Sequence, residues 1–205
     1  PPVNHVIKIT ERLSQQITYP AELLYCGVCQ LVQLGLVVDK EILFPPQYPY
    51  TSSTTRVLRD NFAELYKEVL EVVGLMQSDL IIDIGCNDGN LLSNFQEGHR
   101  VLGVTPEDIG KVARERGIQT ELAYFDFSVA QKILKKYGRA KIVTATNVFA
   151  HIDNVKDALN SIKHLLQSDG VFITESHYLL PLIQENQYDT IYHEHLRYYS
   201  VQSLQ

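Results

Sequence analysis

Short runs of apolar residues alternate with amphipathic stretches over residues 79–175. The apolar runs have the length of buried strands, and the stretches between them carry apolar residues at helical spacing. The pattern therefore predicts five strands, DLIIDIG, RVLGV, IQTELAY, KIVTATN and VFITES, and between them the helices GNLLSNFQE, EDIGKVARERG, FSVAQKILKKYG and VKDALNSIKHLL. Such alternation is typical of an α/β fold with an open, parallel sheet and right-handed crossovers.

The segments outside this region have a different pattern. Residues 56–75 carry apolar residues at helical spacing and predict a helix, with Ser53 or Thr54 as a candidate cap. Residues 1–55 are rich in Pro and Tyr and indicate short strands and ordered loops. The final SVQSLQ predicts the start of another helix, so we expect the sequence to be a piece of a longer protein, cut at both ends.

Composition narrows the class of protein. The 205 residues are 45% hydrophobic, which is enough to fill a core and argues against a disordered chain. No apolar run approaches the length of a membrane-spanning helix, and the first residues lack the pattern of a signal peptide. The net charge of −6 offers no basic footprint for nucleic acid. Three cysteines are too few for a disulfide scaffold, and we expect a cytoplasmic protein.

The turn after the first strand of the sheet carries the clearest ligand-binding signal. In IIDIGCNDGN, Asp83 ends the strand, Gly85 allows a tight turn, and Gly89 lets the following segment start close to a ligand. The spacing differs from the G-x-G-x-x-G of dinucleotide-binding proteins. It resembles the motif of class I S-adenosylmethionine-dependent methyltransferases, although glycine could also serve turn geometry alone.

The ends of the next strands supply further candidates. In that family an acidic residue near the end of the second strand usually holds the ribose, but Thr105 stands here, so Glu107 or Asp108 could substitute. Tyr124, Phe125 and Asp126 follow the third strand as an adenine wall and edge contact, or as aromatic core packing. The fourth strand ends at Asn147, with Phe149 and His151 beyond it, in the crevice where open α/β sheets bind ligands.

The segment IYHEHLRYYS suggests acid–base chemistry. If it is helical, Tyr192 and His195 share one face, whereas His193 points away, so a single metal site from both histidines is disfavoured. His195 is then a candidate general base that Glu194 orients. The alternative is a polar helix surface with unrelated histidines. Hydroxyl groups that could stabilise an enolate oxygen belong to Tyr192, Tyr48 and Tyr50.

Taken in order, YCGVCQLVQL, YPYTSS, DIGCNDGNLL, NVFAHIDNV and DTIYHEHLRYYS resemble the sugar C-methyltransferases that act on nucleotide-activated keto-deoxysugars. The resemblance covers nearly the whole chain. It implies a partial N-terminal zinc-binding-type domain with a tyrosine loop over residues 1–55, and a Rossmann-like methyltransferase core over residues 56–205 that lacks the family's C-terminal domain. It also implies a nucleotide-sugar substrate and, for this chain, a monomer or weak dimer.

The resemblance assigns roles to residues. His195 would remove a proton beside the keto group, and the resulting enolate would attack the methyl group of S-adenosylmethionine in line. The implied reaction centre comprises His195, Glu194, Tyr192, His151, Tyr48 and Tyr50. The implied cofactor-binding residues are Asp83, Gly85, Cys86, Asn87, Asp88, Gly89, Thr105, Pro106, Phe125, Asp126, Asn147 and Ser52. Of these, Cys86 is expected to be a small packed residue rather than a nucleophile.

The family's zinc site uses two C-x-x-C pairs, and this chain holds only Cys26 and Cys29. Two thiolates leave a tetrahedral zinc ion underligated, so we expect no properly formed zinc site here. His5 is a weak candidate for a further ligand, and the alternative is a turn with two free thiols.

Three rival functions stay open at this point. One is an O- or N-methyltransferase for a small polar molecule, which needs the cofactor site but not the YHEH base. Another is a binding module that holds S-adenosylmethionine without chemistry. An NAD-dependent sugar enzyme is disfavoured by the missing G-x-G-x-x-G and the missing Y-x-x-x-K pair.

Overall fold

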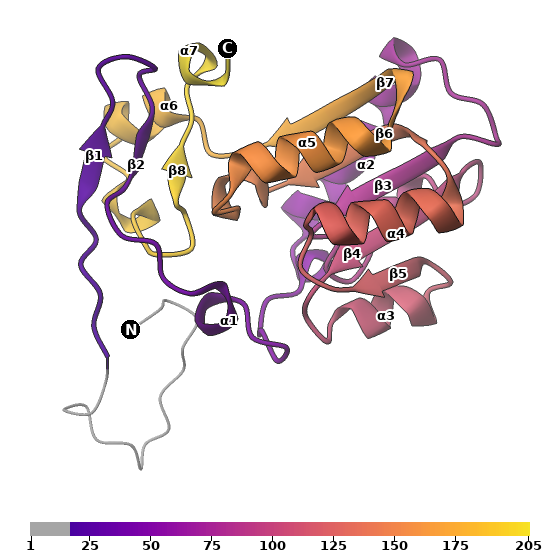
Figure 1. Cartoon of the computed structure of the whole chain (residues 1–205), viewed down its shortest axis with the longest axis horizontal. Helices are drawn as coiled ribbons and strands as arrows, with labels where there is room; N and C mark the ends of the chain where they lie inside the picture. The colour runs from indigo at the N-terminus through magenta and orange to yellow at the C-terminus, as the bar shows by residue number, and fades with distance from the viewer. Residues whose placement is uncertain (1–16) are drawn as a thin grey trace.

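A computed structural model of the chain describes residues 17–205. Its main feature is a five-stranded parallel sheet in the order β5-β4-β3-β6-β7, which confirms the predicted α/β fold (Figure 1). The first strand of this sheet along the chain, β3, lies in the middle, and the order reverses there. The strands are β3 (Leu80–Ile84), β4 (Arg100–Thr105), β5 (Gln119–Leu122), β6 (Ala140–Thr146) and β7 (Leu166–Glu175).

Helices cover both faces of this sheet because its central strand is apolar on both sides. Ile81 and Ile82 are fully buried, and as neighbours in a strand they point to opposite faces. Ile82 belongs to the core cluster with residues of α4 and α5, and Ile81 to the cluster with residues of α2 and α3. The helices are α2 (Arg56–Val72), α3 (Gly110–Glu115), α4 (Phe127–Tyr137) and α5 (Val155–Leu165).

The predicted helix GNLLSNFQE is wrong, because only the short 3-10 turn η3 (Leu92–Asn94) forms there. Polar side chains compete with the helical ladder: Asn94 donates to the carbonyl of Asn90, and Ser93 donates to the carbonyl of Gly89. The apolar positions Leu91 and Phe95 are nevertheless buried in the core. The segment therefore packs as the pattern predicts without forming a regular helix.

Two further boundaries differ from the sequence prediction. Strand β7 begins at Leu166, before the expected turn SDG, and a register shift between Ala140 and Ile142 accommodates the extra residues. Helix α2 begins after Thr55, whose side chain makes no capping hydrogen bond, and neither Ser53 nor Thr54 caps it. The Ser53 hydroxyl donates to Asp88 and the Thr54 hydroxyl donates to the carbonyl of Thr51.

A small antiparallel sheet lies beside the main one, in the order β1-β2-β8 (Figure 1). It joins the beginning of the described chain to its end, because Val32 pairs with Tyr198. The final helix α7 confirms the predicted helical start after Ser200. The remaining elements are β1 (Leu23–Tyr25), β2 (Val32–Leu34), α1 (Lys40–Leu43), η2 (Ser52–Thr54), η4 (Phe149–His151), α6 (Leu179–Gln184), η5 (Tyr188–Thr190), β8 (Arg197–Tyr198) and α7 (Val201–Leu204).

Residues 192–195 form a turn, so the helical alternative for YHEH is wrong. The backbone N–H of His195 donates to the carbonyl of Tyr192, which closes the turn, and Leu196 then donates to the carbonyl of Ala150. This second bond fixes the segment beside the end of β6. Within residues 17–205, no helix has the length and apolar character that crossing a membrane requires.

Candidate active site

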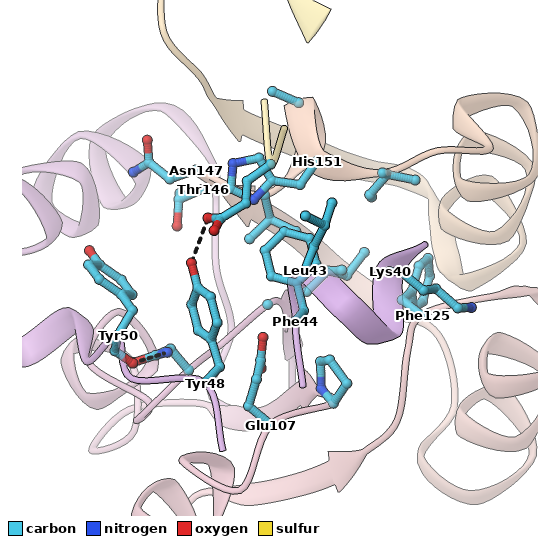
Figure 2. Close-up of a pocket in the computed structure, with 18 of the residues that line it drawn as sticks. Lys40, Leu43, Phe44, Tyr48, Tyr50, Glu107, Phe125, Thr146, Asn147 and His151 are labelled. Atoms are coloured by element: carbon cyan, nitrogen blue, oxygen red, sulfur yellow. Dashed lines mark hydrogen bonds between the residues drawn. The ribbon is translucent and has the colours of Figure 1, made fainter. Parts of the chain in front are cut away.

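A cavity of about 1350 Å³ opens at the carboxyl ends of the sheet strands. Its wall comes from the strand ends, from α1, from the tyrosine loop (residues 47–54) and from residues 192–196 (Figure 2). Sites for one small ligand commonly measure about 300–1,000 Å³. The cavity therefore has room for a cofactor together with a second small molecule.

The glycine turn forms the floor of this cavity in a conformation that favours glycine. Gly85 and Gly89 have φ angles of 75° and 79°. A Cβ on Gly85 would lie 2.2 Å from Cγ2 of Val148, and one on Gly89 would lie 2.6 Å from Cδ1 of Ile118. Both glycines thus serve the backbone turn and close packing, and Gly85 also lines the cavity.

The tyrosine loop is bound directly to this turn. The Ser52 backbone N–H donates to Oδ1 of Asn87 at 2.8 Å, and the Ser52 hydroxyl donates to Oδ1 of Asp88 at 2.6 Å. The Asn87 amide donates to the carbonyl of Tyr50 at 3.1 Å (Figure 2). Asp88 is fully buried and also pairs with Arg116 at 3.1 Å, so its carboxylate anchors the loop from behind the cavity wall.

Two buried carboxyl groups lie along the floor. Asp83 accepts a hydrogen bond of 2.6 Å from the Thr144 hydroxyl, and burial raises its pKa to about 7. Glu107 accepts a hydrogen bond from the Thr105 hydroxyl, and burial raises its pKa as well. Of the two acidic residues that could replace the expected one at Thr105, Glu107 lines the cavity, whereas Asp108 pairs with Lys111.

The predicted cofactor residues fall into two groups by position. Asp88, Gly89 and Thr105 support the wall from behind and do not line the cavity. Those that do line it are Ser52, Asp83, Gly85, Cys86, Asn87, Pro106, Phe125, Asp126 and Asn147. Cys86 is buried against Gly103, where a Cβ would lie 2.4 Å from its Sγ.

Helix α1 closes the end of the cavity beside β5. The Tyr124 hydroxyl donates to the carbonyl of Phe44 at 2.9 Å, and Nζ of Lys40 lies 4.5 Å from the centre of the Tyr124 ring. Phe125 and Asp126 line the cavity under this helix, and the Asp126 carboxylate also caps α4. Tyr124 therefore ties the third strand end to α1, a contact that the sequence pattern does not predict.

The end of the cavity lined by residues 192–196 holds a histidine with a defined tautomer, and Phe44 at the end of α1 reaches this group by stacking on His151 with ring centroids 5.4 Å apart. Nδ1 of His195 lies 2.9 Å from the carbonyl of Thr190, and Nε2 lies 3.0 Å from the Tyr192 hydroxyl. A carbonyl can only accept, so the proton is assigned to Nδ1. Nε2 then carries the lone pair, to which Tyr192 donates. This nitrogen has the protonation state that a general base needs.

Two more histidine rings surround His195. The His151 ring stacks on it with centroids 5.1 Å apart, and the His177 ring lies at 4.6 Å. Burial, and the nearby histidines, lower the pKa of His151 to about 3, and burial lowers the pKa of His195 to about 4. Both rings are therefore neutral at pH 7.

The tyrosine loop reaches this end as well. The Tyr48 hydroxyl donates to Oε2 of Glu194 at 2.7 Å (Figure 2), and burial followed by this bond raises the pKa of the Tyr48 phenol. Tyr50 lines the cavity and is half exposed. His193 points away, with Nε2 at 3.0 Å from the carbonyl of Tyr19, so the two histidines do point apart although the segment is not helical. All six predicted reaction-centre residues line one cavity.

Glu175, His177 and Asn61 also line the cavity and were not predicted from the sequence. A signal for the first two was present, since Glu175 ends the fifth strand and His177 follows it, at the carboxyl edge of the sheet where ligands bind. Asn61 lies on α2 and carries no comparable signal, because nothing in a helical pattern indicates which exposed amide faces a ligand.

Cys26 and Cys29 lie in a tight turn of the small sheet, and both thiols are free and exposed. The backbone N–H of Gln30 donates to the carbonyl of Cys26, and the Cys26 N–H donates to the carbonyl of Leu31. Across residues 17–205, no three His, Cys, Asp or Glu side chains gather in a way that could hold a metal ion. His5 lies outside the described residues.

Comparison with known proteins identifies the class. Residues 54–205 match the family model described as a methyltransferase domain, so the chain belongs to the methyltransferase domain family. This match and the sheet order confirm the predicted class I, Rossmann-like core of an S-adenosylmethionine-dependent methyltransferase.

The chain is also similar to particular proteins. It is 36% identical over 188 residues to the C-methyltransferase NovU of Streptomyces niveus, covering 91% of this chain and 44% of that protein. The chain thus spans less than half the length of this curated relative. A solved S-adenosylmethionine-dependent methyltransferase of Anabaena variabilis superposes with a TM-score of 0.52 at 18% identity, over 73% of this chain and 69% of that one. The solved YcgJ protein of Bacillus subtilis superposes with a TM-score of 0.51 at 18% identity, over 71% of this chain and 64% of that one. These two likenesses concern the fold.

Proposed function

We propose that this chain is the catalytic core of a C-methyltransferase that acts on a keto-deoxysugar carried by a nucleotide. The similarity to a C-methyltransferase supports the type of bond formed. The observation that carries the proposal is the position of His195: its ring, with the lone pair assigned to Nε2, lines the same cavity as the glycine turn.

The floor of the cavity fits S-adenosylmethionine. Glu107 offers a carboxyl group to ribose hydroxyls, and Pro106 and Phe125 offer apolar surfaces for an adenine ring. Acidic side chains suit a positively charged sulfonium, and Lys40 is the sole lysine or arginine among the described residues of the wall. The acidic residues of the wall are Asp39, Glu41, Asp83, Glu107, Asp126, Asp153, Asp157, Glu175 and Glu194.

When bound, S-adenosylmethionine supplies an electrophilic methyl group. His195 accepts at Nε2 the proton of the carbon beside the ketone, once substrate displaces the Tyr192 hydroxyl from that lone pair. The electron pair of the C–H bond would form the enolate and then the new C–C bond, and the electrons of the broken C–S bond would leave on the sulfur of S-adenosylhomocysteine.

Because the pKa of His195 is low, proton removal from carbon depends on stabilising the oxyanion that develops. The Tyr192 hydroxyl, once displaced from Nε2, can donate to that oxygen, and the Tyr48 hydroxyl can do so by exchanging its bond to Glu194 for one to the substrate. Each such donor is typically worth about 10²–10³ in rate.

The acidic wall also limits where a nucleotide can bind. A diphosphate needs basic side chains, and Lys40 lies at the far end of the cavity, over Tyr124. We therefore expect the sugar ring to enter this cavity and the diphosphate to be held by residues beyond its wall.

The test replaces His195 by Asn. Calorimetry with S-adenosylhomocysteine measures cofactor binding, and mass spectrometry measures methylation of nucleotide-activated 4-keto-deoxysugars. Deuterium exchange beside the ketone in D₂O isolates proton removal. We expect exchange and methylation to fall about 10²–10⁴-fold with unchanged binding. His193→Asn is the matched control, because this buried neighbour faces away from the cavity.

Unchanged turnover in the His195 variant would overturn the base role and favour an O- or N-methyltransferase. Binding of S-adenosylhomocysteine by the unaltered chain with no methylated or exchanged sugar would overturn the proposal for this chain and favour a binding module.

A further inference from the structure

Glu175 carries a carboxylate that two amides hold at the cavity wall. Its Oε2 accepts from the Asn61 side chain at 2.9 Å, and its Oε1 accepts from the Asn147 side chain at 3.0 Å. The three residues come from α2, from the end of β6 and from the end of β7. Each lines the cavity, so the carboxylate is oriented toward a ligand rather than paired with a cation of the protein.

The backbone reinforces this arrangement. Asn147 has a φ of 55°, in the left-handed region that few residues other than glycine adopt. Its N–H donates to the carbonyl of Glu175 at 2.7 Å while its side chain donates to the carboxylate of the same residue. Asn147 thus binds Glu175 twice, and the turn after β6 sets the direction of the Glu175 side chain. Figure 2 shows Asn147 beside Thr146 at the cavity wall.

Each oxygen of the Glu175 carboxylate accepts from one amide and has a further lone pair. An ionised carboxylate forms its strongest hydrogen bonds with a cationic donor. The lysine of the wall, Lys40, lies over Tyr124 at the other end and does not meet this need. The ligand must therefore bring the positive charge.

S-adenosylmethionine has such a group in its α-ammonium. Its nucleoside end fits over Glu107 and Phe125, at the ends of β4 and β5. Its amino-acid end must then extend across the central strand β3 toward β6 and β7, because the sheet order is β5-β4-β3-β6-β7. Glu175 ends β7, next to Asn147 at the end of β6.

We propose that Glu175 binds the α-ammonium group of S-adenosylmethionine, with Asn61 and Asn147 as positioning residues. This assignment rests on the cofactor part of the proposed function. It gives the amino-acid end of the cofactor a charged partner, whereas Asp83, which also lines the cavity, accepts from the Thr144 hydroxyl and has a raised pKa because it is buried.

The experiment is a double-mutant cycle between protein and ligand, read by calorimetry. Glu175→Gln is compared with the unaltered chain, using S-adenosylhomocysteine and its desamino analogue, in which hydrogen replaces the α-ammonium. We expect the substitution to weaken binding of S-adenosylhomocysteine about 10- to 100-fold. Binding of the desamino analogue should weaken less than about 2-fold. Glu121→Gln is the control, since that carboxylate pairs with Lys136 away from the cavity.

Asn61→Leu tests the positioning role with the same pair of ligands. Loss of one amide should weaken binding of S-adenosylhomocysteine about 3- to 10-fold and should leave binding of the desamino analogue nearly unchanged. Equal loss for both ligands in either variant would overturn the inference, because it would indicate a structural role or a contact with another part of the ligand. Failure of the unaltered chain to bind either ligand would instead overturn the cofactor site of the proposed function.

Discussion

The two ends of the cavity are built in different ways. At the glycine turn, residues 83–87 of one short segment form the floor, and Asp88 and Gly89 support it from behind through hydrogen bonds and close packing. At the histidine end, His151, His177 and His195 come from three segments and meet only in the folded chain. The tyrosine loop bonds to both ends, through Ser52 on one side and Tyr48 on the other.

The difference shows how each end controls charge. Burial raises the pKa of Asp83 at the glycine turn and lowers the pKa of His195 at the other end. Both shifts favour the uncharged form, because a poorly solvated cavity disfavours any isolated charge. The histidine end therefore holds neutral imidazoles that can accept a proton, while the glycine turn holds a carboxyl group, Asp83, whose uncharged form is favoured by burial.

The strongest test of this comparison is Gly85→Ala. The added Cβ would lie 2.2 Å from Val148, at a φ of 75°, so we expect a loss of about 2–4 kcal/mol in unfolding free energy. Thermal unfolding should show a fall of about 5–15 °C. Gly98→Ala is the control, since a Cβ added there would have nothing within 4 Å. Equal stability of the two variants would contradict a floor that depends on glycine.

The histidine end predicts sensitivity to acid. The pKa of His151 is lowered to about 3 in the folded chain, so its stabilising contribution is complete above about pH 6.5 and is lost as pH falls toward 3. Within that window, each fall of one pH unit lowers the free energy of unfolding by about 1.4 kcal/mol. His151→Gln should flatten the pH dependence of chemical unfolding between pH 6.5 and 4.

His164→Gln serves as the control for that measurement, because this ring lies on α5 and does not line the cavity. If both substitutions flatten the curve equally, the acid sensitivity does not arise from the buried histidine cluster.

The smallest expected effect concerns the loop that joins the two ends. Tyr48→Phe removes the 2.7 Å hydrogen bond to Glu194 while keeping the ring. We expect a cost of about 1–2 kcal/mol in unfolding free energy, since a bond to a buried carboxylate is lost. Urea unfolding measures this cost. A variant as stable as the unaltered chain would indicate that the bond to Glu194 does not help to hold the loop, which also bonds to Asn87, Asp88 and Arg59.

Much of the fold could be predicted because its signals are local. The apolar runs and the glycines mark the strands of the main sheet and their turns, and five of the six predicted helices form, α7 among them. The prediction failed at GNLLSNFQE, where side chains of Ser93 and Asn94 bond to the backbone and replace the helix. Helical spacing of Leu91 and Phe95 did not reveal this competition.

The residues of the candidate site could be predicted only in part, for the same reason. Asp83, Gly85 and His195 could be predicted because each stands in a recognisable sequence motif. Asn61 and the ring contacts of His177 could not be predicted, because their role depends on which side chains face one another across the cavity. The zinc and domain assignments of residues 1–55 stay predictions.

The sequence by itself determined the parallel sheet, the glycine turn and the residue types of the reaction centre, because periodicity and backbone preference act over a few neighbouring residues. Only the tertiary structure decided that Tyr192 donates to His195, that Tyr48 meets Glu194 and that Glu175 lies between two amides. Most of those contacts join segments far apart in the chain, and their geometry follows from sheet order and packing.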